Sequence, residues 1–311
     1  MKKATMKDIA RLANVSVATV SYVLNNVKNQ TIPDPTRQSI LQIAKELNYV
    51  PNLAARSLVV QRTGMVGILI NKSSQLPYWK RQSYLMLVDS LETKLTESGY
   101  HTLLISLDPG NPAMDVIRER KLDAVFVVDV MDDMFYRISA NFVDGVPLIL
   151  IDSLIDDRMF NQVNYNYPLA LESALSAATA PSCLIMESFH NQALMNWIID
   201  SSGLSKQSIY ISADPAGTPR TLETFLEQNR SKHVIVINEF LAKAVEQTGR
   251  ASSITALCTC GIPEILQSGT RIVQFQNNRA QTAYELMMTL KHAPDDPKIS
   301  AGNQFLVEVL P

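Results

Sequence analysis

The stretch that decides the fold is residues 7–25, which read KDIARLANVSVATVSYVLN. Thr5 followed three residues later by Asp8 is a helix-start pattern, and the apolar residues after it recur at helical spacing. After a break at residues 14–15, the Ser16 hydroxyl can accept from the amides of a following turn, so a second helix is expected to begin there. The stretch predicts two short helices joined by a tight turn.

A third helix is predicted from Asp34, as N-cap with Pro35 at the first helical position, to about Asn48. Two helices joined by a tight turn and braced by a third form a helix-turn-helix domain, expected over residues 1–50. A small three-helix bundle with no nucleic acid partner is the alternative. The residues expected to face inward are Ile9, Ala10, Leu12 and Ala13, then Val20, Val23 and Leu24, then Ile40, Ile43, Ala44 and Leu47.

Charge is distributed unevenly along the 311 residues. Residues 1–62 hold nine basic and three acidic side chains, a net charge of +6, while the whole chain is at -2. The rest therefore carries -8. A basic head on an acidic body favours contact between the head and a polyanion, although a solvated basic face is the simpler interpretation.

The outward side of the second predicted helix carries small, short polar or aromatic side chains, which can approach base edges closely. Val17 and Ala18 can meet thymine methyl groups, and Ser21 and Tyr22 can hydrogen-bond to bases or phosphates. This composition indicates a recognition helix for the major groove.

Residues 7–25 closely resemble the headpiece of the LacI/GalR family of bacterial transcription regulators. The resemblance continues without a gap through Thr36-Arg37, residues 47–52 (LNYVPN), residues 54–58 (AARSL) and residues 63–70 (TGMVGILI). It implies a symmetric homodimer on a palindromic operator in double-stranded DNA. Val17, Ala18 and Tyr22 match the family's base readers, while the positions that match contacts to phosphate or neighbouring bases are Thr5, Ser16, Thr19, Ser21, Asn25 and Asn29.

Residues 51–62 match the family's hinge, which folds into a short helix on the operator and inserts a leucine into the minor groove. Here that leucine is Leu58, beside Ala55 and Arg56. An apolar wedge of this kind unstacks a base step and bends the duplex, at a cost of about a few kcal/mol that the added contact repays. A buried or dimer-contact leucine is the alternative for Leu58.

The body, residues 63–311, alternates strand and helix patterns, which predicts an α/β fold with parallel sheets covered by helices on both faces. Two such series indicate two lobes, with a ligand crevice at the carboxyl ends of the strands. The resemblance implies the same two-lobed, periplasmic-binding-protein-like effector domain. The expected elements are strands at 65–70, 101–106, 124–128, 146–151, 182–186, 208–211, 233–237 and 254–257, and helices at 84–99, 113–121, 191–201, 219–229 and 242–247, with a tail returning at 274–292 to the first lobe and at 305–309 to the second.

No enzyme signature is present: there is no glycine-rich phosphate loop or nucleophile elbow, and the four histidines lack metal-ligand spacing. No cofactor, metal or catalytic residue is therefore expected. The three cysteines, Cys183, Cys258 and Cys260, are an odd number without zinc or redox spacing, and no apolar run approaches the length of a membrane span. A cytoplasmic protein without an export signal is expected.

The crevice residues predicted to bind an effector come from strand ends and one loop. Asn71, Asp152 and Asn238 follow apolar strands, Gln274 lies on a crossing segment, and Tyr78 and Trp79 stand where the family places aromatics beside its ligand. Carboxylate and amide groups suit a hydroxyl-rich ligand such as a sugar. Trp79 can equally serve lobe packing.

Two departures from the family bear on the effector. The family's effector-binding arginine falls at Ala193, and its aspartate falls at about Cys260; each removes a charge-assisted hydrogen bond of about 1.5 to 3 kcal/mol. Glu187 and Glu239 are candidate replacement acceptors. Two regulatory interpretations remain: a sugar or sugar derivative that closes the lobes, or a changed pocket controlled by a non-sugar metabolite, a protein partner or expression level.

The function expected from the sequence is a dimeric DNA-binding repressor of a carbohydrate-utilisation operon. A helix at 84–95, with Leu85, Val88, Leu91 and Leu95 in one stripe, is a candidate dimer surface or simply core. A transporter's solute-binding protein would share the body but has no use for a basic helix-turn-helix. A sugar-converting enzyme would need Asp152 paired with Glu187 or Glu239 as acid and base.

Overall fold

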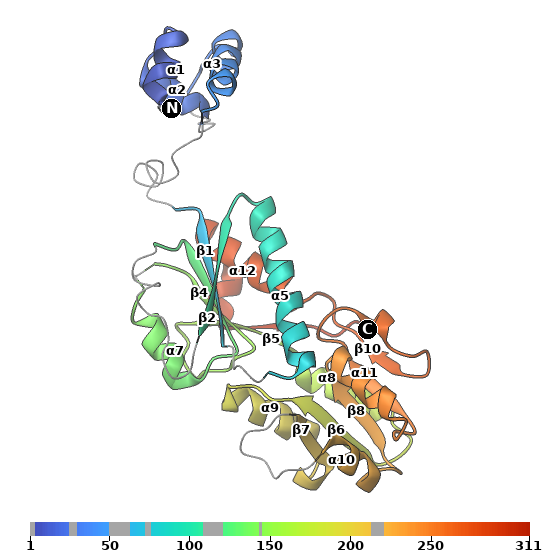
Figure 1. Ribbon diagram of the computed structural model, residues 1–311. Helices are drawn as coiled ribbons and strands as arrows, with labels where there is room; N and C mark the ends of the chain where they lie inside the picture. The colour runs from blue at the N-terminus through green and yellow to red at the C-terminus, as the bar shows by residue number, and fades with distance from the viewer. Residues whose placement is uncertain are drawn as a thin grey trace. The chain divides into compact units, whose positions relative to one another are not determined.

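The computed structural model describes residues 4–24, 30–49, 63–71, 76–107, 121–142, 145–212 and 221–311 (Figure 1). The chain divides into two compact units, Met1–Thr63 and Gly64–Pro311, called here the head and the body. The predicted hinge at 51–62 and most of the predicted helix at 113–121 lie outside the described residues. So do five predicted DNA contacts: Asn25, Asn29, Ala55, Arg56 and Leu58.

The head is built from α1 (Met6–Leu12), α2 (Val17–Leu24) and α3 (Asp34–Glu46) around a small apolar core. Its centre is Ile9, Val20 and Ile40, one from each helix and all without solvent exposure. Two expectations for the head were wrong. Leu12 is 56% exposed, because the buried stripe of so short a helix ends at Ala10, and Pro33 rather than Asp34 is the N-cap of α3.

The first lobe of the body is a six-stranded parallel sheet in the order β11-β5-β4-β3-β1-β2. Apolar residues of α5 and α12 pack on one face and those of α7 on the other. The bounds are β1 Met65–Asn71, β2 His101–Leu107, β3 Ala124–Val128, β4 Leu148–Ile151, β5 Asn161–Tyr165, β11 Gln304–Val307, α5 Tyr78–Glu97, α7 Asp132–Ser139, α12 Arg279–His292 and α13 Pro297–Ala301.

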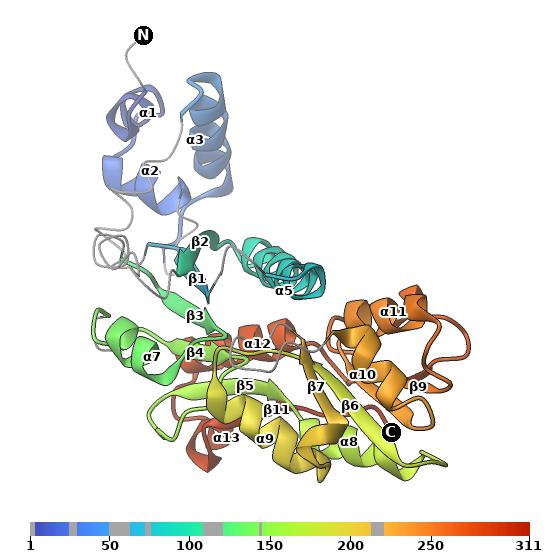
Figure 2. The ribbon, with the colours of Figure 1, turned by 60° about the horizontal axis from the view of Figure 1, so that its bottom comes forward.

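The second lobe is a five-stranded parallel sheet in the order β10-β9-β8-β6-β7. Helices α8 and α9 cover one face and α10 and α11 the other (Figure 2). The bounds are β6 Ser182–Glu187, β7 Ile209–Ser212, β8 His233–Ile237, β9 Ile254–Leu257, β10 Arg271–Val273, α8 Tyr167–Ser176, α9 Gln192–Ser202, α10 Leu222–Gln228 and α11 Glu239–Thr248, with single 3-10 turns at Lys206–Ser208 and Pro263–Ile265. The predicted α/β class with two parallel-sheet lobes is confirmed.

Helix α5 and strand β11 differ from expectation, and the elements α7, α8, α13, β5 and β10 were not predicted. Helix α5 begins at Tyr78 rather than Tyr84, so that its first turns reach the second lobe, where α5 contacts α11 (Figure 1). The last strand, β11, belongs to the first lobe rather than the second, because it pairs in parallel with β5. Strand β5 escaped prediction since its sequence, NQVNY, lacks an apolar run.

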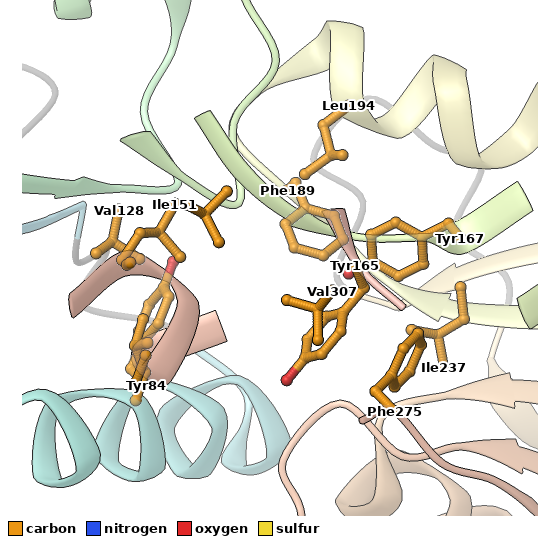
Figure 3. Packing of buried hydrophobic residues seen from close by; sticks show 14 of the residues in the cluster. Tyr84, Val128, Ile151, Tyr165, Tyr167, Phe189, Leu194, Ile237, Phe275 and Val307 are labelled. Atoms are coloured by element: carbon orange, nitrogen blue, oxygen red, sulfur yellow. The ribbon is translucent and has the colours of Figure 1, made fainter. Parts of the chain in front are cut away.

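One apolar cluster runs through both lobes. Tyr84 and Ile151 of the first lobe and Ile237 of the second belong to it, and Figure 3 shows Tyr165, Tyr167 and Phe275 packed between them. Leu91 and Leu95 of the predicted dimer stripe are also buried in this core, whereas Leu85 is 59% exposed. None of the helices in the described ranges is long and apolar enough to cross a membrane.

Candidate functional site

The turn between α1 and α2 is fixed by local hydrogen bonds. Thr5 and Asp8 form a capping box at the start of α1, and Ser16 Oγ accepts from the amide of Thr19 at 3.0 Å at the start of α2. Asn14 takes a left-handed conformation, with φ of 52°, which asparagine tolerates better than most residues. The backbone therefore turns sharply after α1 and presents α2 at a set angle.

The outward side of α2 is open to solvent. Val17 and Tyr22 are large side chains that lie on the surface, with exposed fractions of 41% and 37%. Ala18, on the same side of the helix, is also exposed. Ser16 and Thr5 are exposed, while Thr19 and Ser21 are half-buried. Of the predicted DNA contacts that the structure describes, Val17, Ala18 and Tyr22 thus lie on the surface of the head, outside its apolar core.

The carboxyl edge of the first-lobe sheet carries three polar residues side by side. Asn71, Asp129 and Asp152 end or follow the neighbouring strands β1, β3 and β4, and the parallel register puts them next to one another. All three are at most 1% exposed, and both aspartates have positive φ, 50° and 54°. A row of this kind lies where parallel α/β sheets bind their ligands.

The second lobe faces this row with Glu187 at the end of β6 and Asn238 after β8. Asn238 caps α11 by accepting from the amide of Phe240 at 2.9 Å, and its Nδ2 donates to Glu187 Oε1 at 3.3 Å. Both side chains are buried. The five residues Asn71, Asp129, Asp152, Glu187 and Asn238 lie between the lobes and are closed off from solvent; this position is called below the interlobe crevice.

The crevice is bridged by Lys80, from the first turn of α5 and only 3% exposed. Its Nζ lies 3.1 Å from Asp129 Oδ2 in the first lobe and 3.2 Å from Glu187 Oε2 in the second. Burial alone would lower the pKa of Lys80, but the two carboxylates outweigh it and the pKa is raised. Lys80 is therefore charged and joins the lobes.

Asp129 is the most heavily bonded carboxylate of the crevice. Its Oδ2 accepts from Tyr84 Oη at 2.7 Å and lies 3.1 Å from His190 Nδ1, and its Oδ1 accepts from the His190 amide at 2.7 Å. Burial would raise the pKa of Asp129, yet Lys80 and His190 hold it well below its usual range. His190 precedes α9 of the second lobe, so this carboxylate too links the lobes.

A second ion pair joins Asp152 to Arg279, the first residue of α12. Both side chains are at most 3% exposed, and Arg279 Nη2 also donates to Ser83 Oγ at 2.7 Å. Burial would lower the pKa of Arg279, but Asp152 raises it well above its usual value. Beside Arg279 a cavity of about 20 Å³ remains, enough for roughly one water molecule.

The two departures from the family pattern have local consequences. Near Ala193, the preceding Asn191 caps α9 and donates to the first-lobe carbonyl of Val130 at 3.1 Å. At Cys260, the backbone amide donates to Glu239, whose carboxylate also accepts from Gly261. Burial raises the pKa of Glu239, and these amides offset part of the rise. The carboxylate of Glu239 is therefore bonded to backbone amides of its own lobe.

The predicted effector residues are only partly brought together. Asn71, Asp152 and Asn238 line the crevice, Trp79 is half-buried against the second-lobe core, and Tyr78 is exposed with an edge-to-face contact to Phe240 at 5.8 Å. Gln274 is exposed and lies outside the crevice. The sequence reasoning missed Lys80, Asp129, His190 and Arg279, of which only Asp129, directly after an apolar strand, carried a readable signal.

Comparison with known proteins gives matches in both parts of the chain. Residues 5–52 match the family "Bacterial regulatory proteins, lacI family". The HTH-type transcriptional regulator RegA of Clostridium acetobutylicum is 30% identical over 187 residues, which are 58% of this chain and 52% of RegA. The chain thus spans about half the length of the curated relatives it matches.

Two solved structures share the fold over nearly the whole chain. The lac repressor dimer bound to operator and the anti-inducer ONPF has a TM-score of 0.68 at 14% identity, covering 99% of this chain and 97% of the repressor. The complex of the transcriptional regulator CelR with cellobiose has a TM-score of 0.55 at 14% identity, covering 99% and 98%. The helix-turn-helix head thus matches the lacI family of bacterial regulatory proteins over residues 5–52, and the chain shares its fold with the lac repressor and with CelR.

Proposed function

We propose that this protein is a sequence-specific DNA-binding transcriptional repressor. As a homodimer it binds a palindromic operator, places α2 of each head in the major groove, and responds to a small molecule taken up in the interlobe crevice. In its specific form the proposal assigns it to a carbohydrate-utilisation operon with a sugar or sugar derivative as effector.

The observation that carries the proposal is the outward row of α2. Val17 and Tyr22 are large side chains left exposed on a helix whose first turn is fixed by Ser16 and whose inner side is fully buried at Val20. Exposed apolar groups on a rigid helix of a head at +6 suit direct contact with base edges and methyl groups beside a phosphate backbone.

Support for a small-molecule effector comes from the body. Its fold is shared with the CelR complex with cellobiose, and the buried amides and carboxylates of the crevice can give and take hydrogen bonds. The alternative proposal, a changed pocket for a non-sugar ligand, rests on the ion pairs of Lys80 and Arg279, because these cations occupy acceptors that a sugar would use.

The test is a binding selection of the full chain on random palindromic duplexes, followed by a salt titration on the enriched site. We expect one palindrome with a central flexible step to be enriched, with an affinity that falls linearly in log salt. The variant V17A/Y22A should then bind at least roughly tenfold more weakly, because each lost base contact costs about 1 to 3 kcal/mol.

The matched control is Leu41→Ala, which removes a side chain of similar exposure, 44%, from α3. It should keep the affinity of the wild type. Absence of any enriched palindrome, or equal loss in the Leu41 and α2 variants, would contradict the proposal.

A further inference from the structure

The ammonium group of Lys80 is surrounded in the crevice by carboxylates and aromatic rings. Besides the carboxylates of Asp129 and Glu187, its Nζ lies 4.0 Å from the centroid of the Phe189 ring and 5.1 Å from that of Tyr84. Ammonium groups enclosed by carboxylates and aromatic faces are strongly favoured once desolvated. The enclosure is built from both lobes and receives the lysine from α5.

The crevice holds three carboxylates against the two cations of Lys80 and Arg279. Lys80 and Arg279 face three buried carboxylates, Asp129, Asp152 and Glu187, and His190 Nδ1 also lies 3.1 Å from Asp129 Oδ2. An excess buried carboxylate is costly unless a cation compensates it. Three buried carboxylates therefore suit a cationic ligand better than an anionic one such as a sugar phosphate.

Hydrogen-bonding capacity is also left over in the crevice. Among the described residues, both polar atoms of the Asn71 side chain and Oδ1 of Asp152 are buried without a hydrogen-bond partner. Buried polar groups in native proteins are normally paired, and each unpaired one costs about 1 to 3 kcal/mol. These atoms lie on the same sheet edge as Asp129, where a polar ligand would meet them.

We propose that the interlobe crevice is a binding site for a primary ammonium group, and that Lys80 occupies it as a tethered ligand that holds the lobes together. This inference rests on the function proposed above and names its effector class. The effector is a hydroxyl-bearing organic amine whose ammonium group takes the place of Lys80 and whose polar groups pair with Asn71 and Asp152. A neutral sugar would leave the carboxylates uncompensated on displacing the lysine.

The test is chemical rescue of Lys80→Ala in the full chain, without DNA. The substitution removes three methylenes and the ammonium, which n-propylamine restores. We expect the equilibrium constant for unfolding to rise by roughly a hundredfold or more in Lys80→Ala, and n-propylamine to reverse this saturably. Tetramethylammonium at equal ionic strength should not rescue, and the wild type should respond weakly because its site is filled.

Two variants control the rescue. Lys243→Ala removes another ion-paired lysine, 3.2 Å from Glu246, and should not respond to n-propylamine. Lys80→Met fills the space without charge, so it should unfold more readily than the wild type and not be rescued. A Lys80→Met as stable as the wild type, or a Lys80→Ala that neither responds to n-propylamine nor refolds in its presence, would overturn the ammonium site.

A last measurement separates this inference from the proposed function. Operator affinity of Lys80→Ala is measured with and without n-propylamine. A change in affinity supports control of the head by this site. No change in affinity, although n-propylamine restores the stability, overturns the assigned effector class. If the wild type binds no operator at all, the proposed function fails while the rescue still decides the ammonium site.

Discussion

The head and the interlobe crevice differ in whether the side chains of their candidate binding residues are exposed or buried. On α2 of the head, Val17 and Tyr22 are exposed while the apolar core beneath is closed. In the crevice, Lys80 is paired with Asp129 and Arg279 with Asp152, and all four side chains are buried. The head can thus meet a partner as it stands, whereas the crevice must exchange internal bonds for external ones.

Because of this difference in burial, ligands of the two regions lose different interactions when they bind. A duplex that docks on α2 displaces mainly water and counterions. A ligand of the crevice must replace desolvated ion pairs, so only a group of matching charge recovers what is lost. The comparison predicts that the body tolerates changes of charge poorly and the head tolerates surface changes well.

The largest effect is expected at the Arg279–Asp152 pair. Arg279→Ala leaves the Asp152 carboxylate buried without its cation and should lower the free energy of unfolding by about 3 to 5 kcal/mol. Urea unfolding of the full chain measures it. The double variant Arg279→Met with Asp152→Asn removes both charges and should recover much of the loss; a double variant no more stable than the single one would break this side of the comparison.

The next effect concerns the head. Ile9→Ala empties a fully buried position and should cost the head about 2 to 5 kcal/mol, while Leu12→Ala, at a position 56% exposed, should stay within about 0.5 kcal/mol. Hydrogen exchange of the amides in α1, α2 and α3 reports the head separately from the body. Equal protection in the two variants would show that burial in this core has been misjudged.

The smallest effect is a dependence on pH at Asp129. The pKa of Asp129 in the folded chain lies below the unfolded value of about 3.9, so its contribution to stability is complete above the unfolded value and is lost as the pH falls from there through the lower folded pKa. Each unit of lowering is worth roughly 1.4 kcal/mol. We expect wild type to lose stability relative to Asp129→Asn as the pH is lowered from about 5 to 2, as measured by urea unfolding at each pH. Parallel pH profiles would contradict this.

The head could be predicted from sequence nearly in full because its signals are local. The Thr5 and Asp8 capping box, the left-handed Asn14 and the Ser16 cap each act within four residues along the chain. The two wrong predictions for the head concern Leu12 and the N-cap of α3. Both positions lie at helix ends, where a shift of one residue changes exposure.

The crevice could be predicted only where a polar residue follows an apolar strand, as Asn71, Asp152 and Asn238 do. Lys80 and Arg279 stand in helices, where a charged side chain is by default solvated, and only the meeting of distant segments buries them. Strand β5 failed for a related reason, since Gln162 is buried by bonding to the backbone of Ile155, a contact invisible in the local pattern.

The left-handed backbone at three crevice positions limits which residues can occupy them. Asp129, Asp152 and Asn238 have φ of 50°, 54° and 88°, a region open chiefly to glycine, asparagine and aspartate. Few residue types can therefore replace one another at these three positions. Two of them, aspartate and asparagine, differ by one charge and little in shape. The crevice is built so that its electrostatic preference can change in single-charge steps while its backbone stays the same.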